Sequence, residues 1–167
     1  AELRFSDGDG RGRIRLLSLF PGIALARISV RGAAWPVPAS EGRGPEAGGP
    51  LIISYCSTGR CELTLSDGGS AVLTAGQVSL TERAVCGNYG YPGGSYEGVG
   101  IIIDPEPASD GKGLLREYFG VDISALRESC CPDGRTFLAR MTLPEELAGR
   151  LCRIFREEGG RGSTGVK

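Results

Sequence analysis

Hydrophobic and polar residues alternate along several short stretches of this chain, which is the pattern of half-buried β-strands. The stretch Arg13-Ile14-Arg15-Leu16 shows the alternation clearly. We expect strands over 13–19, 23–30, 51–56, 61–65, 71–73, 78–80 and 96–103. Turn-forming pairs such as Pro21-Gly22 and Asp67-Gly68 separate them. Many short strands joined by glycine turns indicate an antiparallel barrel or sandwich.

The pattern changes to helical spacing after Asp104. We expect a short helix over 113–119 that Gly120 closes, and a second that Asp122 caps. A longer helix follows over 143–158, after the capping box Thr142-Leu143-Pro144-Glu145. This helix has an apolar stripe that consists of Leu147, Leu151, Ile154 and Phe155. The stripe must pack either on the barrel of its own chain or on a partner. For Leu147 and Leu151 we expect an inward position.

These patterns divide the chain into four parts. We expect a flexible N-terminus over 1–12, a barrel over 13–104, a helical segment over 105–158 and a flexible tail over 159–167. A long loop rich in glycine and proline occupies 31–50, and we expect it to be mobile together with the tail. The expected fold class is therefore α+β, with an antiparallel barrel followed by a small helical segment.

The charge and the absent residue types exclude several functions. The net charge is −1 and the pI about 5.6, so the totals give no electrostatic reason to bind nucleic acid. The chain has no histidine, which excludes Ser-His-Asp and Cys-His catalysis and imidazole metal sites. We expect a cytoplasmic location, since no apolar run has the length of a membrane span and the N-terminus lacks a signal-peptide core.

The six cysteines do not follow the spacing of a disulfide framework or a zinc site. They are Cys56, Cys61, Cys86, Cys130, Cys131 and Cys152. We therefore expect free thiols with a packing role, no disulfide, no bound metal and no cofactor.

Four segments, taken in order, resemble one protein family. They are Phe20-Pro21-Gly22-Ile23, the stretch 54–62 with Gly59-Arg60-Cys61-Glu62, the stretch 73–80, and Tyr96-Glu97-Gly98 with the apolar run behind it. Their order and spacing resemble the N-terminal domain of AraC/XylS-type bacterial transcription regulators. Gln77 departs from that pattern, because an aspartate is usual at this place in the turn. The resemblance implies a cupin-like barrel.

The same resemblance implies that the chain senses an unidentified small-molecule effector and forms a homodimer. DNA would then bind only through a C-terminal helix-turn-helix domain absent from this chain, and the chain itself would not be an enzyme. Two other classes stay open: a small stand-alone cupin-like enzyme, and a protein-interaction barrel whose interior is filled by side chains.

Aromatic residues are the best candidates for a ligand pocket, because their rings give apolar contact area and a polar tip. The candidates are Trp35, Tyr55, Tyr89, Tyr91 and Tyr96, together with Arg60. An ordinary place in the barrel core is at least as good an interpretation for any one ring. Arg60 and Glu62 lie two apart after a turn, so they share one face of a strand, and a structural pair is favoured over ligand contact there.

Overall fold

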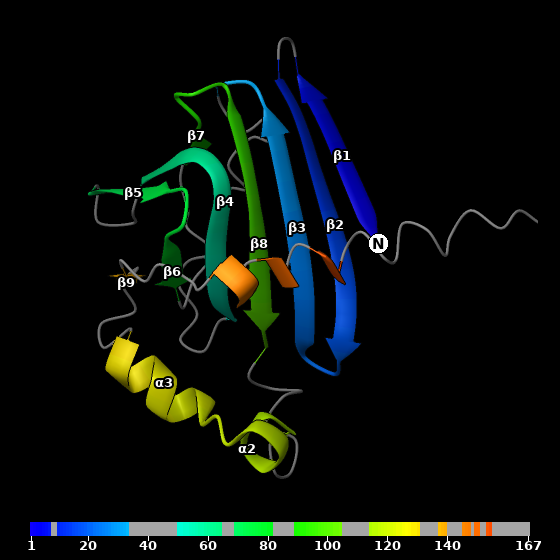
Figure 1. Ribbon diagram of the computed structural model, residues 1–167, viewed down its shortest axis with the longest axis vertical. Helices are drawn as coiled ribbons and strands as arrows, with labels where there is room; N and C mark the ends of the chain where they lie inside the picture. The colour runs from blue at the N-terminus through cyan, green and yellow to red at the C-terminus, as the bar shows by residue number, and fades with distance from the viewer. Residues whose placement is uncertain are drawn as a thin grey trace, which may run out of the picture.

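The computed structural model shows an antiparallel sheet that folds back on itself, with helices on its outer face (Figure 1). It describes residues 1–7, 10–33, 50–64, 69–81, 89–104, 114–130 and 137–139, and the short helical pieces 145–147, 149–150 and 153–154. The loop over 34–49 and the tail over 159–167, both expected to be mobile, lie outside the described residues.

The first three strands form an antiparallel meander. They are β1 (Glu2–Asp7), β2 (Gly10–Phe20) and β3 (Ile23–Arg31). The sheet continues from β3 to β8 (Ser95–Ile103), β4 (Leu51–Thr64), β6 (Val78–Thr81) and β9 (Phe137–Ala139). Every neighbouring pair is antiparallel. The strand β3 therefore finds its second partner far along the chain, in β8.

The long strand β4 belongs to two sheets. Its first part pairs with β8 and β6, and its last part pairs with β5 (Ser70–Thr74) and β7 (Tyr89–Gly90). The change of sheet coincides with a shift of register between Cys56 and Thr58 and with a left-handed backbone at Gly59, where φ is 89°. β4 bends at this place and carries β5 and β7 over one face of the main sheet (Figure 1).

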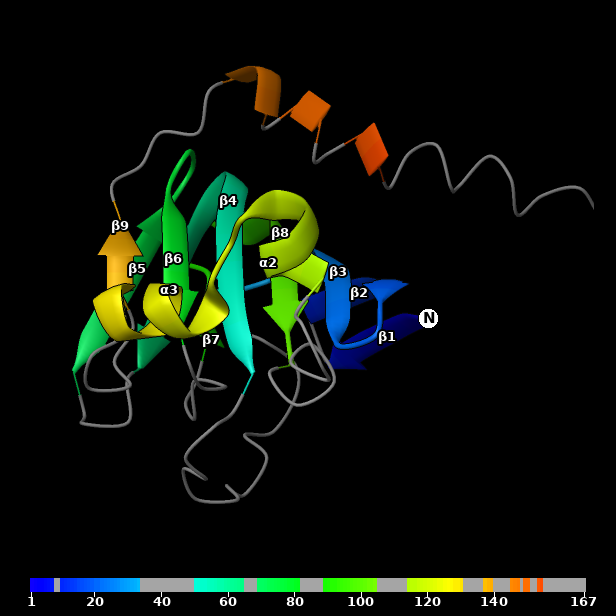
Figure 2. The ribbon, with the colours of Figure 1, turned by 90° about the horizontal axis from the view of Figure 1, so that it is seen from below.

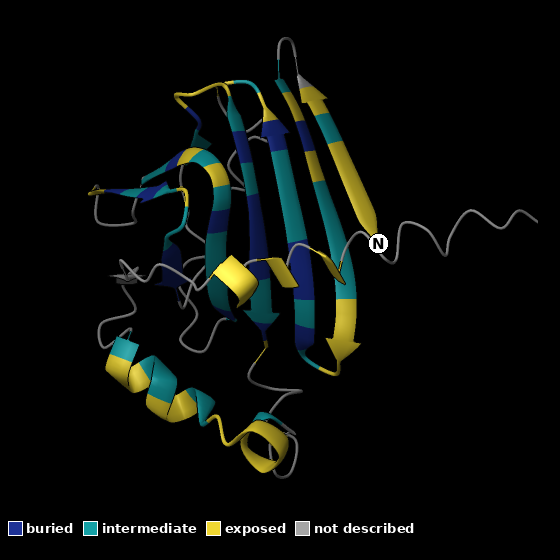
Figure 3. Ribbon diagram, viewed as in Figure 1, coloured by how far each residue is buried: buried dark blue, intermediate teal, exposed yellow. Residues whose placement is uncertain are grey.

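The two faces of the main sheet carry different residues, because successive side chains of a strand point to opposite sides. The inner face, under β5 and β7, contributes Val30, Cys56 and Tyr96 to a core that Cys61 and Leu73 complete from the second sheet. The outer face has its own apolar cluster around Leu51, Val78 and Ile103. Buried positions concentrate on β8, β3 and β4, whereas β1 and the end of β2 are largely exposed (Figure 3).

Two short helices cover the outer cluster. Helix α2 (Leu114–Phe119) and helix α3 (Ile123–Cys130) contribute Leu115, Ile123, Leu126 and Cys130 to it. Figure 2 shows α2 in front of β8 and α3 in front of β6. Gly120 ends α2 with a φ of 65°, as its position predicted. The Asp122 carboxylate accepts a hydrogen bond of 3.1 Å from the Ala125 backbone NH, so Asp122 is the N-cap of α3.

The expected fold class is confirmed: the chain is α+β, an antiparallel cupin-like arrangement followed by a small helical segment. The sheet is not closed into a barrel over the described strands, because its order runs from β1 to β9 without a return pairing. None of the described helices is long and apolar enough to cross a membrane.

The N-terminus differs from the expectation of a flexible segment over 1–12. Residues 2–7 form β1, which pairs with β2 along its whole length. The reason is visible in the residues, since Glu2-Leu3-Arg4-Phe5 alternates polar and apolar side chains as a strand does. The pairing runs from Glu2–Arg15 to Asp7–Gly10, so the described residues of this segment belong to the sheet.

The C-terminal stripe does not have the inward position expected for Leu147. Leu147 is 48% exposed and Ile154 is 36% exposed, while Leu151 and Phe155 lie outside the described residues. An ion pair of 2.7 Å between Glu146 and Arg150 joins successive turns of this segment. The described part of the stripe is therefore open to solvent in the single chain.

Candidate functional site

The candidate site forms around the bulge in β4. Gly59 lies opposite Tyr96 across the β4–β8 pairing, and the backbone there is so close to Ser95 that an added β-carbon would clash with its carbonyl oxygen. Only glycine fits, both because φ is positive and because the neighbouring backbone fills the space. The Cys56 thiol folds over the bulge and donates to the Gly59 carbonyl oxygen, at 3.6 Å.

Three of the segments that suggested the family meet at this bulge. On one side, the Ser57 hydroxyl donates to the Glu97 carbonyl oxygen at 2.9 Å. On the other side, the Cys56 NH donates to the Gln77 carbonyl oxygen at 3.0 Å, and the Gly76 NH donates to the Cys56 carbonyl oxygen at 2.8 Å. The three segments are far apart in sequence, but hydrogen bonds of their backbones join them around the bulge.

The Gln77 side chain closes the turn that precedes β6. Its side-chain oxygen accepts a hydrogen bond of 2.8 Å from the Thr74 NH, and Gly76 takes the left-handed conformation at a φ of 86°.

The bulge places two tyrosines and two thiols together on the inner face. The rings of Tyr91 and Tyr96 lie with centroids 5.4 Å apart and planes inclined by 40°. The hydroxyl of Tyr91 is hydrogen-bonded to the Cys61 thiol. Tyr89 packs against the same cluster from β7. We call Cys56, Cys61, Tyr89, Tyr91 and Tyr96 the tyrosine–thiol cluster.

The tyrosine–thiol cluster is electrically neutral. Burial raises the pKa of the Cys56 thiol to about 11 and that of Cys61 to about 12. Burial also raises the pKa of Tyr91 and of Tyr96 well above the ordinary value of a phenol. All four groups therefore keep their protons near neutral pH. They offer OH and SH groups in an apolar setting and have no charge with which to bind an ion.

The structure brings together three of the six predicted site residues, namely Tyr89, Tyr91 and Tyr96. Tyr55 is on the other side of the sheet, in the outer cluster with the helices. Arg60 is on the outer surface of the second sheet, where it makes an ion pair of 2.7 Å with Glu62, in line with the structural interpretation of that pair. Trp35 lies outside the described residues.

Sequence reasoning did not place Cys56 and Cys61 in the site. The two are five residues apart, so strict alternation would put them on opposite faces of β4. The bulge adds a residue between them and brings both to the inner core. The gap between the strands expected over 51–56 and 61–65 contains Thr58-Gly59, which lies in a bulge within one strand and not in a turn between two.

Across the described part of the chain, no group of three or more cysteine, aspartate or glutamate side chains stands in position to hold a metal ion. Cys56, Cys61 and Cys130 are free thiols.

No known protein family and no curated protein matches the chain. Solved structures do match. An RmlC-like cupin from Shewanella frigidimarina is 16% identical, with 62% of this chain and 85% of that chain covered and a TM-score of 0.43. An HTH_3 family transcriptional regulator from Vibrio cholerae is 14% identical, with 57% and 52% covered and a TM-score of 0.43. The chain thus spans about half of that regulator, and these likenesses concern the fold alone.

One match corrects an expectation. Ectoine synthase from P. lautus is 14% identical, with 84% of this chain and 83% of that chain covered and a TM-score of 0.41. An enzyme is thus among the matched structures, and the expectation that this protein is not an enzyme was wrong as stated. The missing histidines exclude particular mechanisms and not catalysis as a whole.

Proposed function

We propose that this chain is the ligand-sensing and dimerisation part of an AraC/XylS-type transcription regulator, acting in the cytoplasm, with the tyrosine–thiol cluster as its effector site. The observation that carries the proposal is the convergence of Tyr89, Tyr91 and Tyr96 with two thiols on the inner face of the sheet. Aromatic walls with a few polar tips are typical of small-molecule sites. The meeting of the family's motifs at the β4 bulge supports the same assignment.

The effector would be a small neutral molecule. The cluster holds only protonated phenols and thiols, so a charged ligand would lose its hydration without gaining an opposite charge. Tyr91 and Tyr96 are 3% and 5% exposed in the free chain, so a neutral aromatic or polyhydroxyl compound would have to displace part of the packing of this cluster before it could stack on the two rings and exchange hydrogen bonds with their hydroxyls.

The fold offers a direct route from this cluster to the helices. Cys56 belongs to the inner core, and its neighbour Tyr55 belongs to the outer cluster that α2 and α3 cover. A ligand that shifts the bulge at Cys56 also displaces Tyr55 under the helices. Binding would thus favour one helix arrangement over another, which is how an effector changes a distant function.

The helical segment supplies the proposed dimer contact. Leu147 and Ile154 are seven residues apart, hence on one side of a helix, and both are exposed in the single chain. A two-fold interface would use this stripe on both copies and remove it from water.

Ligand binding is tested by thermal unfolding of the purified chain with neutral aromatic and polyhydroxyl compounds and with their carboxylate or amine counterparts. We expect saturable stabilisation by a neutral compound. Tyr91→Phe and Tyr96→Phe should each weaken its binding about two- to tenfold, since a hydrogen bond contributes roughly 0.5–1.5 kcal/mol. Tyr118→Phe is the matched control, because Tyr118 is 70% exposed on α2. Unchanged affinity in both inner variants, or stabilisation by charged compounds alone, would show that the ligand site is elsewhere.

The regulator assignment has a separate test. The reading frame that follows Lys167 should encode two helix-turn-helix units. A stop codon directly after Lys167 would overturn the regulator assignment and leave the ligand site to be judged by the binding experiment.

A further inference from the structure

Six arginines gather on the outer face of the first three strands. They occupy alternate positions, which places their side chains on one side of the sheet: Arg4 on β1, Arg11, Arg13 and Arg15 on β2, and Arg27 and Arg31 on β3. We call these six residues the arginine face. It continues the side of the sheet that α2 and α3 cover at β4 and β8.

The register places these arginines directly opposite one another. Arg4 is paired with Arg13, Arg11 with Arg31, and Arg15 with Arg27. Like charges in directly opposed positions of a sheet repel and reduce its stability. Three such pairs in one small area lower the stability of the sheet, so the folding of the chain does not by itself explain this arrangement.

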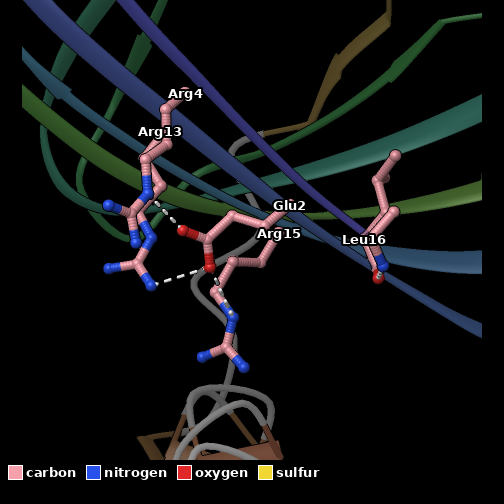
Figure 4. A network of polar contacts seen from close by, with 6 residues as sticks. Glu2, Arg4, Arg13, Arg15 and Leu16 are labelled. Atoms are coloured by element: carbon pink, nitrogen blue, oxygen red, sulfur yellow. Dashed lines mark hydrogen bonds and ion pairs between the residues drawn. The ribbon is translucent and has the colours of Figure 1, made fainter.

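Acidic residues neutralise the arginine face only in part. Glu2 lies 2.9 Å from Arg13 and 3.7 Å from Arg15, and it also pairs with Arg4, as Figure 4 shows. Glu97 lies 3.3 Å from Arg27 and 3.6 Å from Arg31. Six guanidinium groups and two carboxylates leave four positive charges on the described part of this face, although the whole chain has a net charge of −1.

The arginine face is polar, and its outer part is open. The side chains of Arg4, Arg31 and Arg13 are 75%, 67% and 48% exposed, whereas those of Arg27 and Arg15 are 34% and 26% exposed. The residues between them on the same side are Ser6, Ser29 and Ser95, which pair across the strands with Arg11, Arg13 and Arg31. This surface lacks, among its described residues, the aromatic anchors of protein interfaces and the stacking rings of single-strand binders.

We propose that the arginine face binds the phosphate backbone of duplex DNA, without reading its bases. Interfaces with DNA are more polar and far more positive than those with proteins, which matches this surface. The arginines repeat about every 7 Å along a strand and about every 5 Å between strands, so several can reach phosphates at once. Phosphates would also replace the repulsion between opposed arginines by attraction. This contact goes beyond the proposed function, because the sensing part itself would touch DNA.

The test is fluorescence anisotropy of the purified chain with a labelled duplex of arbitrary sequence at several salt concentrations. Four released counterions predict a slope of about −3.6 for the logarithm of affinity against that of salt, hence a loss of roughly 100-fold between 50 and 200 mM. The double variant Arg11→Ser/Arg31→Ser should lower the slope by about 1.8 units and weaken binding at least tenfold at 50 mM salt.

The matched control is Arg116→Ser/Arg150→Ser, which removes the same charge from exposed helical positions. Its affinity and slope should stay close to those of the unchanged chain. Equal losses in both double variants would show a general charge effect, and no loss in Arg11→Ser/Arg31→Ser would show that DNA binds elsewhere or not at all. Tighter binding at the same salt to a poly-glutamate peptide, or to vesicles with anionic lipid, would assign the face to another partner and overturn the proposal.

Discussion

The hydroxyl of Tyr96 lies over Gly98, two residues further along the same face of β8. A β-carbon at position 98 would be 2.5 Å from that oxygen and 2.9 Å from the carbonyl oxygen of Tyr55. Glycine at this place therefore lets the ring of Tyr96 fold down into the tyrosine–thiol cluster. The shape of the site depends on a missing side chain as much as on those present.

Gly98→Ala should destabilise the protein by about 1–3 kcal/mol, because one methyl group overpacks a filled interior. Urea unfolding measures the change. Gly100→Ala is the control on the same face of the same strand, where the nearest side-chain atom, the β-carbon of Ala26, would be at an ordinary 3.7 Å. Equal losses in the two variants would mean that strand propensity, and not the place of Tyr96, explains the effect.

Stability should fall at alkaline pH. Folding raises the pKa of Cys56 from 9.0 to about 11 and that of Cys61 from 9.0 to about 12, so the unfolded chain loses these protons first. The contribution is complete below pH 9 and is lost as pH rises through 11 and 12. Unfolding free energies measured over this range should decline. The decline should become shallower in Cys56→Ser/Cys61→Ser, and an unchanged pH dependence in that variant would contradict the assigned cause.

The thiols should differ in reactivity. Cys56 and Cys61 are buried and protonated, whereas Cys130 at the end of α3 is only partly buried. Cys130→Ser should remove one fast-reacting thiol when the native protein meets an aromatic disulfide reagent. Cys56→Ser should leave the fast phase as it was. Rapid modification of Cys56 in the native state would mean that the inner core opens readily.

The surface pair of Arg60 and Glu62 should matter little for stability. Both side chains are about half exposed, at 50% and 45%, and water screens such pairs. A double-mutant cycle with Arg60→Ala and Glu62→Ala should give a coupling of about 0.2–1 kcal/mol. A much larger coupling, or loss of effector binding in Arg60→Ala, would restore Arg60 as a functional residue.

Leu147→Glu should give a folded monomer if the helical stripe joins two copies. The change puts a charge into an apolar contact on both sides of a two-fold axis, so we expect the dimer dissociation constant to rise well over tenfold. Sedimentation equilibrium measures it, with Glu146→Gln as a control on the neighbouring exposed residue. A wild-type chain that stays monomeric at high concentration would remove the stripe from dimerisation.

Most of the strands and both short helices could be predicted from the sequence because their signals are local. Alternation identified β2, β3, β5, β6 and β8, whereas β1 was expected to be flexible and β4 to be two strands. Gly120 and Asp122 marked where one helix ends and the next begins. Alternation cannot say which face of a strand turns inward. Tyr55 therefore entered the predicted site although it lies in the outer cluster, while its neighbour Cys56, which packs against Tyr96 in the inner cluster, did not.

Properties that depend on pairing across the sheet were not predictable. The arginines of the first strands are spread over residues 4–31. The net charge of the whole chain is near zero, so it does not indicate that positive charges gather on one face. Only the register shows that Arg11 is opposite Arg31 and that Arg15 is opposite Arg27. The position of Cys61 likewise depends on a bulge, which the residues Thr58-Gly59 alone do not distinguish from a turn.

The order in which the strands pair has a consequence for synthesis of the protein. β3 ends at Arg31, but its second neighbour, β8, begins only at Ser95. During synthesis the meander of β1, β2 and β3 thus leaves the ribosome before β8 has been made. Until then the edge of β3 that later pairs with β8 stays unpaired. Such an edge invites pairing with another nascent chain. Arginines on one side of this waiting sheet repel their counterparts on other chains, so the same residues can protect the growing chain from aggregation.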